Sequence, residues 1–246
     1  MQPLFSIITV TYNAAATVVR TIESVDSQTF SDYEQIIVDG ASTDNTLSLI
    51  AESERRQIQS EPDKGLYDAM NKGIKLARGQ YLIFLNAGDK FHDARTLSRI
   101  ARAIQTEDSL PDIVYGQTAI VDNEGNFIGE RHLRAPRDLK FKDFARGMLV
   151  CHQAFIVRRD IAPTYDLSYR YSADYEWCLR CLQKSRSNVF IDDYIVDYLN
   201  EGVTTANHKK SLHERYDIMC KYYGTFPTAL RHLWFAIRAL KRKLLR

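Results

Sequence analysis

The sequence predicts an α/β protein built on a mostly parallel sheet flanked by helices, and three observations support this class. Short apolar runs recur at residues 5–10, 33–38 and 81–85, and each run is too short for a helix. Each run ends in polar, acidic or small residues, as expected where a strand leaves the core. Between the first two runs lie apolar residues at helical spacing, and a strand, a helix and a strand within about forty residues are typical of a parallel sheet.

The remaining elements follow from the same two periodicities. Val18, Val19, Ile22 and Val25 lie on one face of a helix expected at residues 15–25. Further helices are expected near residue 47, over residues 66–78, 94–106 and 172–182, near residue 208 and from residue 227, and further strands over residues 112–115, 118–121, 127–130, 148–157, 189–191 and 195–199.

The composition is that of a globular protein with one good core, because 45% of its 246 residues are hydrophobic. The formal net charge of +2 is unevenly distributed, since residues 218–246 carry seven Lys or Arg and no acid. Of the 33 basic residues, 26 remain for the rest of the chain against 31 acidic ones, which leaves that part at −5. This division argues against a general nucleic-acid binder and indicates a separate electrostatic partner for the basic tail.

No export signal or membrane span is recognisable in the sequence. The first residues lack a basic and an apolar region followed by a small-residue cleavage site, and no apolar run reaches the length of a span. The cysteines Cys151, Cys178, Cys181 and Cys220 lie far apart or on predicted helices, which suits reduced thiols. Cys178 and Cys181 form a C-x-x-C pair without a second pair or a nearby histidine, so we interpret them as packing residues. We therefore expect a cytoplasmic protein.

Polar and acidic residues gather where three predicted strands end. They are Thr11-Tyr12-Asn13 after the first strand, residues 39–44 after the second, and Asn86-Ala87-Gly88-Asp89 after the third. In open α/β sheets, ligands bind outside the carboxyl ends of the strands, where a carboxylate can hold a divalent cation against a phosphate. The simpler alternative is that these residues only turn the chain. Neither G-x-G-x-x-G nor a P-loop is present, so side chains would have to bind a nucleotide.

Asp63 and Lys64 directly precede the helix expected at residues 66–78. Asp63 stands where a helix N-cap is favoured, which is its structural interpretation. Lys64 could meet a phosphate at the start of that helix, where backbone amides already attract anions.

Four motifs in register carry a resemblance to a known family. They are F-S-I-I-T-V-T-Y-N at residues 5–13, V-D-G-A-S-T-D-N-T at 38–46, S-E-P-D-K-G-L-Y-D-A-M-N-K-G at 60–73 and F-L-N-A-G-D at 84–89. In this order they resemble family 2 glycosyltransferases of the GT-A fold, and within that family the bacterial enzymes that assemble colanic acid, capsule and O-antigen repeat units on a lipid carrier.

The resemblance implies roles for residues at matching positions. Those expected to bind the nucleotide sugar are Thr11, Tyr12, Asn13, Asp39, Asp63, Lys64, Asn86, Ala87 and Gly88. Residues 86–89 match the D-x-D region, with Asp89 at the metal-binding acid, and a histidine in the late loop, here His208, can join the metal. The commoner pattern is D-A-D-D, so Asn86 and Gly88 replace two acids and leave one carboxylate. The expected cofactor is Mg²⁺ or Mn²⁺, and a surface histidine is the alternative for His208.

The acceptor side is expected around two later segments. The H-Q position of the family, here His152 and Gln153, borders the acceptor pocket, whereas the residue pattern alone favours a core histidine. Sugar transfer needs a base that takes the proton of the acceptor hydroxyl. Residues 171–180 match the E-D block of the family, in which the aspartate, here Asp174, is that base and the reaction inverts the anomeric centre. Helix capping is the structural interpretation of Asp174.

The resemblance and the charge distribution together suggest the domain organisation. Residues 1–207 would form the GT-A domain, with residues 1–92 as the nucleotide-sugar-binding half and residues 93–207 as the acceptor-binding half. Residues 208–246 would form a basic, amphipathic, helical tail. This tail either packs on the core or attaches the protein peripherally to the inner face of the cell membrane.

The predicted function is transfer of a sugar from a UDP-sugar, with a GDP-sugar as the second choice, to a hydroxyl of a saccharide acceptor. Undecaprenyl diphosphate is the expected carrier of that acceptor, in bacterial surface polysaccharide biosynthesis, and no nucleic-acid partner is expected. A noncatalytic nucleotide-sugar-binding module is the first alternative, suggested by the missing acids at positions 86 and 88. The second, a sugar-1-phosphate nucleotidyltransferase, would need a Gly-rich basic loop where residues 11–14 are Thr-Tyr-Asn-Ala.

Overall fold

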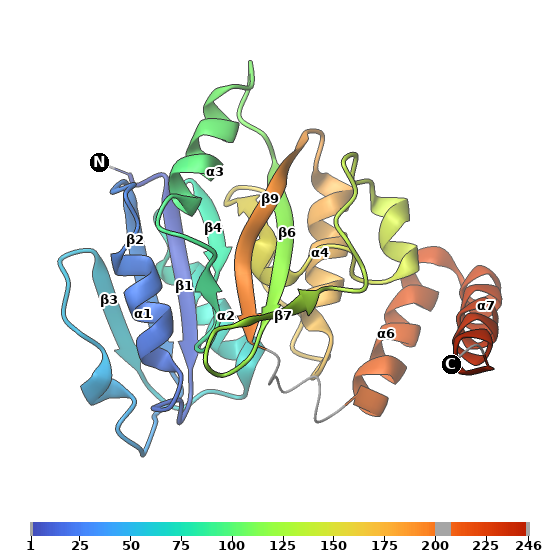
Figure 1. Ribbon diagram of the computed structural model, residues 1–246, viewed down its shortest axis with the longest axis horizontal. Coiled ribbons are helices and arrows are strands. Elements are labelled where there is room, and N and C mark those ends of the chain that lie inside the picture. The colour runs from blue at the N-terminus through green and yellow to red at the C-terminus, as the bar shows by residue number, and fades with distance from the viewer. Residues whose placement is uncertain (1, 200–207, 245–246) are drawn as a thin grey trace.

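The computed structural model describes residues 2–199 and 208–244, with the side chains of His208 and of residues 236–244 outside the description. A single sheet of nine strands runs through the molecule in the order β3-β2-β1-β4-β8-β6-β9-β5, with β7 paired to β6 (Figure 1). The strands are β1 (Phe5–Thr11), β2 (Tyr33–Asp39), β3 (Arg56–Ser60), β4 (Tyr81–Phe84), β5 (Lys90–Phe91), β6 (Ile113–Val121), β7 (Phe127–Glu130), β8 (Phe155–Arg158) and β9 (Asn188–Leu199).

The sheet is parallel in its first half and mixed in its second. β1 pairs in parallel with both β2 and β4, and β2 pairs in parallel with β3. β8 runs antiparallel to β4 and to β6, and β9 returns parallel to β6. The first four strands therefore end at one edge, which is the lower edge in Figure 1.

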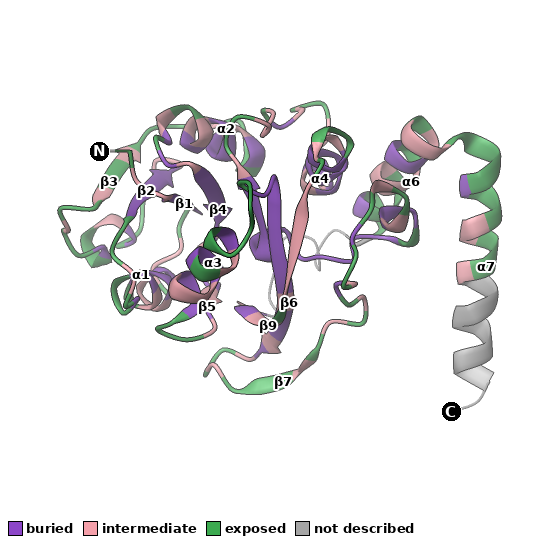
Figure 2. Ribbon diagram, turned by 90° about the horizontal axis from the view of Figure 1, so that it is seen from above, coloured by how far each residue is buried: buried purple, intermediate pink, exposed green. Residues whose placement is uncertain are grey.

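Helices cover both faces of the sheet, as expected of the predicted α/β class. In Figure 2, α1 and α3 lie on one side of the central strands, and α2 and α4 lie on the other. The helices are α1 (Val18–Asp26), α2 (Leu66–Leu76), α3 (Thr96–Gln105), α4 (Ala173–Lys184), α6 (His208–Tyr223) and α7 (Thr225–Leu244), and the short 3-10 helices are η1 (Leu47–Leu49), η2 (Phe141–Arg146) and η3 (His152–Ala154).

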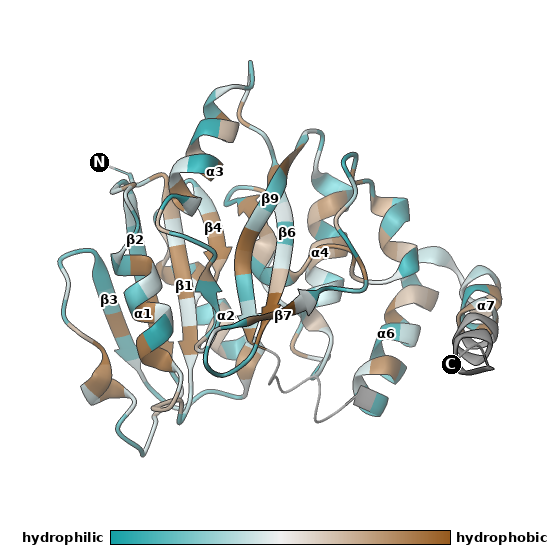
Figure 3. Cartoon of the chain, viewed as in Figure 1, coloured by the Kyte–Doolittle hydropathy of each residue, from teal (hydrophilic) through white to brown (hydrophobic). Residues whose placement is uncertain are grey.

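The core lies along the inner strands, as the apolar runs predict. Every residue of β1, β2 and β4 is buried, whereas β3 at the sheet edge has no buried residue. Figure 3 shows this contrast as apolar colour along β1 and β4 and hydrophilic colour along β3. The polar sequence of β3 explains why apolar periodicity did not reveal this strand.

The structure corrects the predicted strands in three places. The strand expected at residues 148–157 is wrong over most of its length, because Cys151 leads into the 3-10 turn η3 and only residues 155–158 pair as β8. The strands expected at 112–115 and 118–121 are one strand, β6, and those at 189–191 and 195–199 are likewise one strand, β9. The register of the β6–β9 pair shifts between Gly116 and Thr118. These shifts interrupt the alternation of side chains between the two faces of the sheet, but both strands continue through them.

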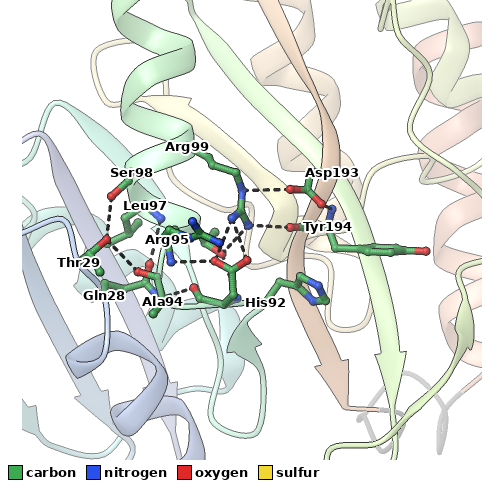
Figure 4. A network of polar contacts seen from close by, with 12 residues as sticks. Gln28, Thr29, His92, Ala94, Arg95, Leu97, Ser98, Arg99, Asp193 and Tyr194 are labelled. Atoms are coloured by element: carbon green, nitrogen blue, oxygen red, sulfur yellow. Dashed lines mark hydrogen bonds and ion pairs between the residues drawn. The ribbon is translucent and has the colours of Figure 1, made fainter.

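A polar network joins the end of α1, helix α3 and strand β9 (Figure 4). Arg99 binds both carboxylate oxygens of Asp93 at 2.8 and 2.9 Å and the Asp193 carboxylate at 3.1 Å. The Gln28 amide donates to the Asp93 carbonyl at 2.8 Å and accepts the Leu97 N–H at 3.0 Å. These bonds fix the second half of the sheet against the first.

The last two helices extend from one end of the molecule, far from β3 (Figure 1). Ile218 and Met219 of α6 are buried in the main core, so α6 is part of the folded body. The described start of α7 is much more open, with Phe226 at 74% and Leu233 at 60% exposure. Within the described residues, no helix combines the length and hydrophobicity needed to span a membrane.

Candidate active site

The carboxyl ends of the first strands bring predicted site residues together. Thr11 and Asp39 are register partners in the β1–β2 pair, and Asp39 is opposite Ser60 in the β2–β3 pair. The Ala87 N–H donates to the Val10 carbonyl at 3.3 Å, which places the turn after β4 beside the end of β1. The segments that follow β1, β2 and β4 therefore lie together at one edge of the sheet, as the sequence predicts. We call this edge the rim.

Asp39 is fully buried and shapes the loop that follows β2. Its carboxylate accepts the Ser42 N–H at 2.9 Å and the Ser60 hydroxyl at 2.7 Å, and the Ser42 hydroxyl donates to it as well. These bonds hold the loop after β2 against the end of β3. Asp39 thus sets the shape of the rim, and its contact with a nucleotide stays a prediction.

Asn13 joins the loop after β1 to the loop after β2. It adopts φ 48°, its N–H donates to the Ser42 hydroxyl at 2.8 Å, and its side-chain carbonyl accepts the Thr43 N–H at 2.8 Å. The next residue, Ala14, donates its N–H to the Thr46 hydroxyl at 2.7 Å. The backbone N–H and the side-chain carbonyl of Asn13 therefore both bind the loop after β2. The neighbouring residue Tyr12 is 63% exposed.

Tyr12, Gly40 and Asp63 meet above the strand ends. A methyl group added at Gly40 would lie 2.5 Å from Asp63 Oδ2 and 3.3 Å from the Tyr12 ring. The other Asp63 oxygen accepts the Gly65 N–H at 2.8 Å, and Gly65 itself is the N-cap of α2. Asp63 is thus not the N-cap, and its contact with a nucleotide sugar stays a prediction. Lys64 is exposed beside it.

The turn after β4 is held by a threonine of α1. The Thr21 hydroxyl accepts the Gly88 N–H at 2.9 Å and donates to the Asp89 carbonyl at 2.7 Å. Gly88 has φ +104°, a backbone conformation that side chains rarely allow. Asn86 Oδ1 and Thr11 Oγ1 are buried at this rim, and neither has a hydrogen-bond partner among the described residues.

The predicted metal ligand Asp89 points into the protein. Only 5% of Asp89 is exposed, and its two oxygens accept the Gln153 amide at 2.7 Å and the Leu199 N–H at 3.1 Å. Burial raises the pKa of Asp89 to about 7, against the opposing effect of these hydrogen bonds. Among the described residues, no group of three His, Cys, Asp or Glu side chains is placed to hold a metal. The side chain of His208, the second predicted ligand, lies outside the described residues, so metal binding by Asp89 and His208 stays a prediction.

His152 and Gln153 are both buried behind the rim. The His152 ring packs against Phe84 and Trp177, with ring centroids 4.8 and 5.5 Å away, and His152 Nε2 lies 2.5 Å from the Tyr165 hydroxyl. Burial lowers the pKa of His152 to about 4, against the opposing charge of Asp174. This placement is that of the core histidine considered as the structural alternative, and contact of either residue with an acceptor stays a prediction.

Asp174 reaches the rim from the second half of the chain. It lies in the first turn of α4, and Asp174 Oδ1 accepts the Tyr67 hydroxyl at 3.2 Å and the Tyr175 N–H at 2.8 Å. Burial and then the charge of Asp174 raise the pKa of Tyr67 well above its usual range. Tyr67 is the second residue of α2 and follows Asp63 by four residues, so Asp174 faces the same end of the sheet as the strand-end residues.

Sequence reasoning missed Tyr67 as a partner of Asp174. Tyr67 lies inside the third motif, S-E-P-D-K-G-L-Y, so its position was visible, but its partner is 107 residues away in the chain. Glu214 of α6, whose carboxylate accepts the backbone N–H groups of residues 170–172, was also missed, because nothing in the local sequence marks it.

The fold is shared with solved glycosyltransferase structures of the GT-A class. The chain superposes on *S. aureus* TarS residues 1–349 with a TM-score of 0.71 and 16% identity, covering 94% of this chain and 72% of that one. It superposes on the *Pyrobaculum calidifontis* mannosyltransferase PcManGT, solved with GDP-Man and Mn²⁺, with a TM-score of 0.63 and 14% identity, covering 96% and 76%.

Sequence comparison identifies the family. The model of glycosyl transferase family 2 matches residues 6–165, and the chain belongs to this family. It is 40% identical over 187 residues to a PGL/p-HBAD biosynthesis glycosyltransferase of *Mycobacterium bovis*, covering 73% of this chain and 70% of that protein. The resemblance of the four motifs to family 2 glycosyltransferases is therefore confirmed, and so is the GT-A fold, whereas the finer resemblance to enzymes of colanic acid, capsule and O-antigen assembly stays a prediction.

Proposed function

We propose that this protein is an inverting glycosyltransferase that moves one sugar from a nucleotide diphosphate sugar to a hydroxyl of a saccharide acceptor. The observation that carries the proposal is the position of Asp174 at the rim where the strand ends meet, bonded to Tyr67 of the opposite half. Family membership supports it, as does the TarS structure solved with UDP-GlcNAc, which has a TM-score of 0.71 and 18% identity.

The donor would bind over the ends of β1, β2 and β4. Among the described residues, Thr11 Oγ1 and Asn86 Oδ1 have no hydrogen-bond partner there, and a buried polar atom without a hydrogen bond costs about 1–3 kcal/mol. Donor hydroxyl or amide groups would supply the missing bonds. The exposed Tyr12 ring offers a face for a base, and Lys64 at the start of α2 suits a phosphate. A UDP-sugar is our first choice of donor and a GDP-sugar the second.

Asp174 would act as the general base. It takes the proton of the acceptor hydroxyl while that oxygen forms a bond to the anomeric carbon. The bond between that carbon and the diphosphate oxygen breaks, and the nucleoside diphosphate leaves with the bonding electrons. One displacement on the face opposite the leaving group inverts the anomeric centre, and no covalent intermediate with the protein is required.

A divalent metal, Mg²⁺ or Mn²⁺, remains part of the proposal, with Asp89 and His208 as its predicted ligands. When bound, such an ion would stabilise the negative charge of the diphosphate as a Lewis acid. The Mn²⁺ in the PcManGT structure supports metal use, whereas the buried Asp89 carboxylate argues against a ready ligand. Turnover measured with EDTA, Mg²⁺ or Mn²⁺ tests the requirement directly.

The acceptor is proposed to be a saccharide on undecaprenyl diphosphate, reached at the inner face of the cell membrane during surface polysaccharide biosynthesis. On α7, the exposed side chains Phe226, Leu230, Leu233 and Trp234 recur at helical spacing. The chain from residue 218 onward carries seven Lys or Arg and no acid, which suits an anionic lipid surface. Cosedimentation with phosphatidylglycerol vesicles but not phosphatidylcholine vesicles is expected, and the double variant Leu233→Ser with Trp234→Ser should weaken it.

The decisive experiment measures nucleotide release from UDP-, GDP- and dTDP-sugars with and without a lipid-linked acceptor. We expect one donor class to be used, and Asp174→Asn to lower kcat by about 10²–10⁴-fold with donor affinity retained. The matched control is Asp192→Asn, since Asp192 is an exposed acid in a surface ion pair with Arg137. Donor binding without turnover, unchanged by Asp174→Asn, would favour the noncatalytic binding module instead.

A further inference from the structure

Helix α6 holds the segment that leads into Asp174. The Glu214 carboxylate of α6 accepts three consecutive backbone N–H groups, those of Arg170 at 2.8 Å, Tyr171 at 2.7 Å and Ser172 at 2.9 Å. Asp174 follows two residues later, in the first turn of α4. A single side chain thus fixes the backbone immediately before the proposed base.

The first turn of α4 depends on α6, because the N-cap residue of α4 makes no side-chain capping bond. Ser172 is the N-cap residue of α4, but its hydroxyl forms no capping bond. It donates instead to the Ser211 carbonyl of α6 at 3.1 Å and lies 2.9 Å from the Ser211 hydroxyl. A carboxylate such as Glu214 is favourable beside a helix N-terminus, where backbone N–H groups lack partners within the helix.

Other contacts between α6 and α4 lie farther along α4. The Tyr222 hydroxyl donates to Glu176, and the Arg215 guanidinium lies 5.5 Å from the centre of the Tyr175 ring. These contacts attach α6 to α4 but do not touch the backbone before Asp174. They provide a comparison for the role of Glu214 within the same pair of helices.

We propose that Glu214 is a positioning residue that sets the location of the Asp174 carboxylate for sugar transfer. This inference rests on the proposed function, in which Asp174 is the base. Glu214 holds the backbone on one side of Asp174 through three bonds, and Tyr67 holds the carboxylate itself on the other side. Misplacing a reacting group by about 1 Å can lower a rate by about 10²-fold, so loss of this anchor should act on the chemical step.

The test uses the full chain with Glu214→Gln and Glu214→Ala. Glu214→Gln keeps the length of the side chain but removes its charge and one acceptor oxygen. We expect kcat to fall about 10-fold in Glu214→Gln and up to about 100-fold in Glu214→Ala, with the donor KM within about twofold of wild type. Tyr222→Phe is the matched control, because it removes one bond between the same helices away from Asp174, and its kcat should stay near wild type.

Amide hydrogen exchange supplies a readout that does not depend on activity. In both Glu214 variants, the amides of residues 170–172 should exchange faster, while those of the inner strand β1 stay protected. Faster exchange together with the selective loss of kcat would support the proposal. Unchanged exchange, or faster exchange with wild-type kcat, would overturn it, and so would an equal loss of kcat in Tyr222→Phe.

The design separates this inference from the proposed function. If Asp174→Asn kept full activity, the base assignment would fail, and with it the positioning role of Glu214. If Asp174→Asn were inactive but Glu214→Gln fully active, only the positioning role would fail. Glu214→Gln keeps the test usable even where Glu214→Ala fails to fold.

Discussion

The two halves of the rim are built in different ways. On the side of β1 and β2, polar side chains bind within adjacent strand-end loops, as Asp39 binds Ser42 only three residues away. On the other side, Asp174 binds Tyr67 across 107 residues and Gln153 binds Asp89 across 64. The proposed donor side is therefore shaped by neighbouring loops, whereas the proposed acceptor side is assembled from distant segments.

Because the two sides are built differently, substitutions on each side should have different effects. A change on the donor side should disturb one loop cluster and the stability that the cluster provides. A change on the acceptor side should act through the packing of helices and strands that meet only in the folded protein. The following substitutions test this comparison in order of expected effect.

Asp39→Ala should have the largest effect on stability. It removes a fully buried carboxylate with three hydrogen bonds, and at about 1.5 kcal/mol each we expect a loss of about 4.5 kcal/mol in the free energy of unfolding. Urea denaturation measures this loss, with the exposed Asp138→Ala as control. A loss below about 1 kcal/mol would show that the loops hold together without Asp39.

His152 should make stability depend on pH from the acceptor side. Because burial lowers its pKa to about 4, native His152 stays neutral while the unfolded chain takes up a proton below about 6.5. Its contribution is fully present above pH 6.5 and is lost, by about 3 kcal/mol, as the pH falls through 6.5 towards 4.

The free energy of unfolding of wild type minus that of His152→Phe, measured at several pH values, should fall by about 3 kcal/mol between pH 6.5 and 4, because this difference cancels the titration of other buried groups such as Asp89. The exposed His213→Ala serves as control and should keep the wild-type dependence. Equal acid sensitivity of His152→Phe and wild type would mean that His152 is not the buried neutral group described.

Gly88→Ala tests the junction where the two sides touch. The substitution would force a side chain into φ +104° and place its Cβ 3.1 Å from Leu199 at the end of β9. We expect a loss of about 2 kcal/mol. Gly125→Ala has a similar positive φ of 87°, with its nearest contact at 3.9 Å, so it should cost less. Thermal unfolding measures both losses. An equal decrease in Tm for Gly88→Ala and Gly125→Ala would mean that the contact with Leu199 has no effect on stability.

Tyr67→Phe should have the smallest effect. It removes only the hydroxyl that donates to Asp174 at 3.2 Å, and the Tyr175 N–H still binds the same carboxylate. A bond worth about 1 kcal/mol corresponds to a decrease in kcat of about fivefold. Steady-state kinetics with the preferred donor measure it. A decrease in kcat as large as that of Asp174→Asn would mean that Tyr67 does more than hold the Asp174 carboxylate in place.

The sequence predicted the first half of the molecule well. Its apolar runs mark β1, β2 and β4, and the polar residues after them lie at one rim, because parallel strands end at the same edge. Prediction was weaker after residue 147, where an apolar run was interpreted as a strand. Residues 148–151 are buried without pairing, and apolar periodicity cannot separate a buried loop from a buried strand.

The sequence alone determined the fold class, the family motifs and the chemical groups at the strand ends, because strand pattern and motif spacing are local properties of the chain. Only the tertiary structure decided that Asp89 is buried and that Glu214 holds the segment before Asp174. Burial and long-range hydrogen bonds depend on which distant segments pack together. That choice is made by the free energy of the whole fold, so no local pattern around these residues could reveal it.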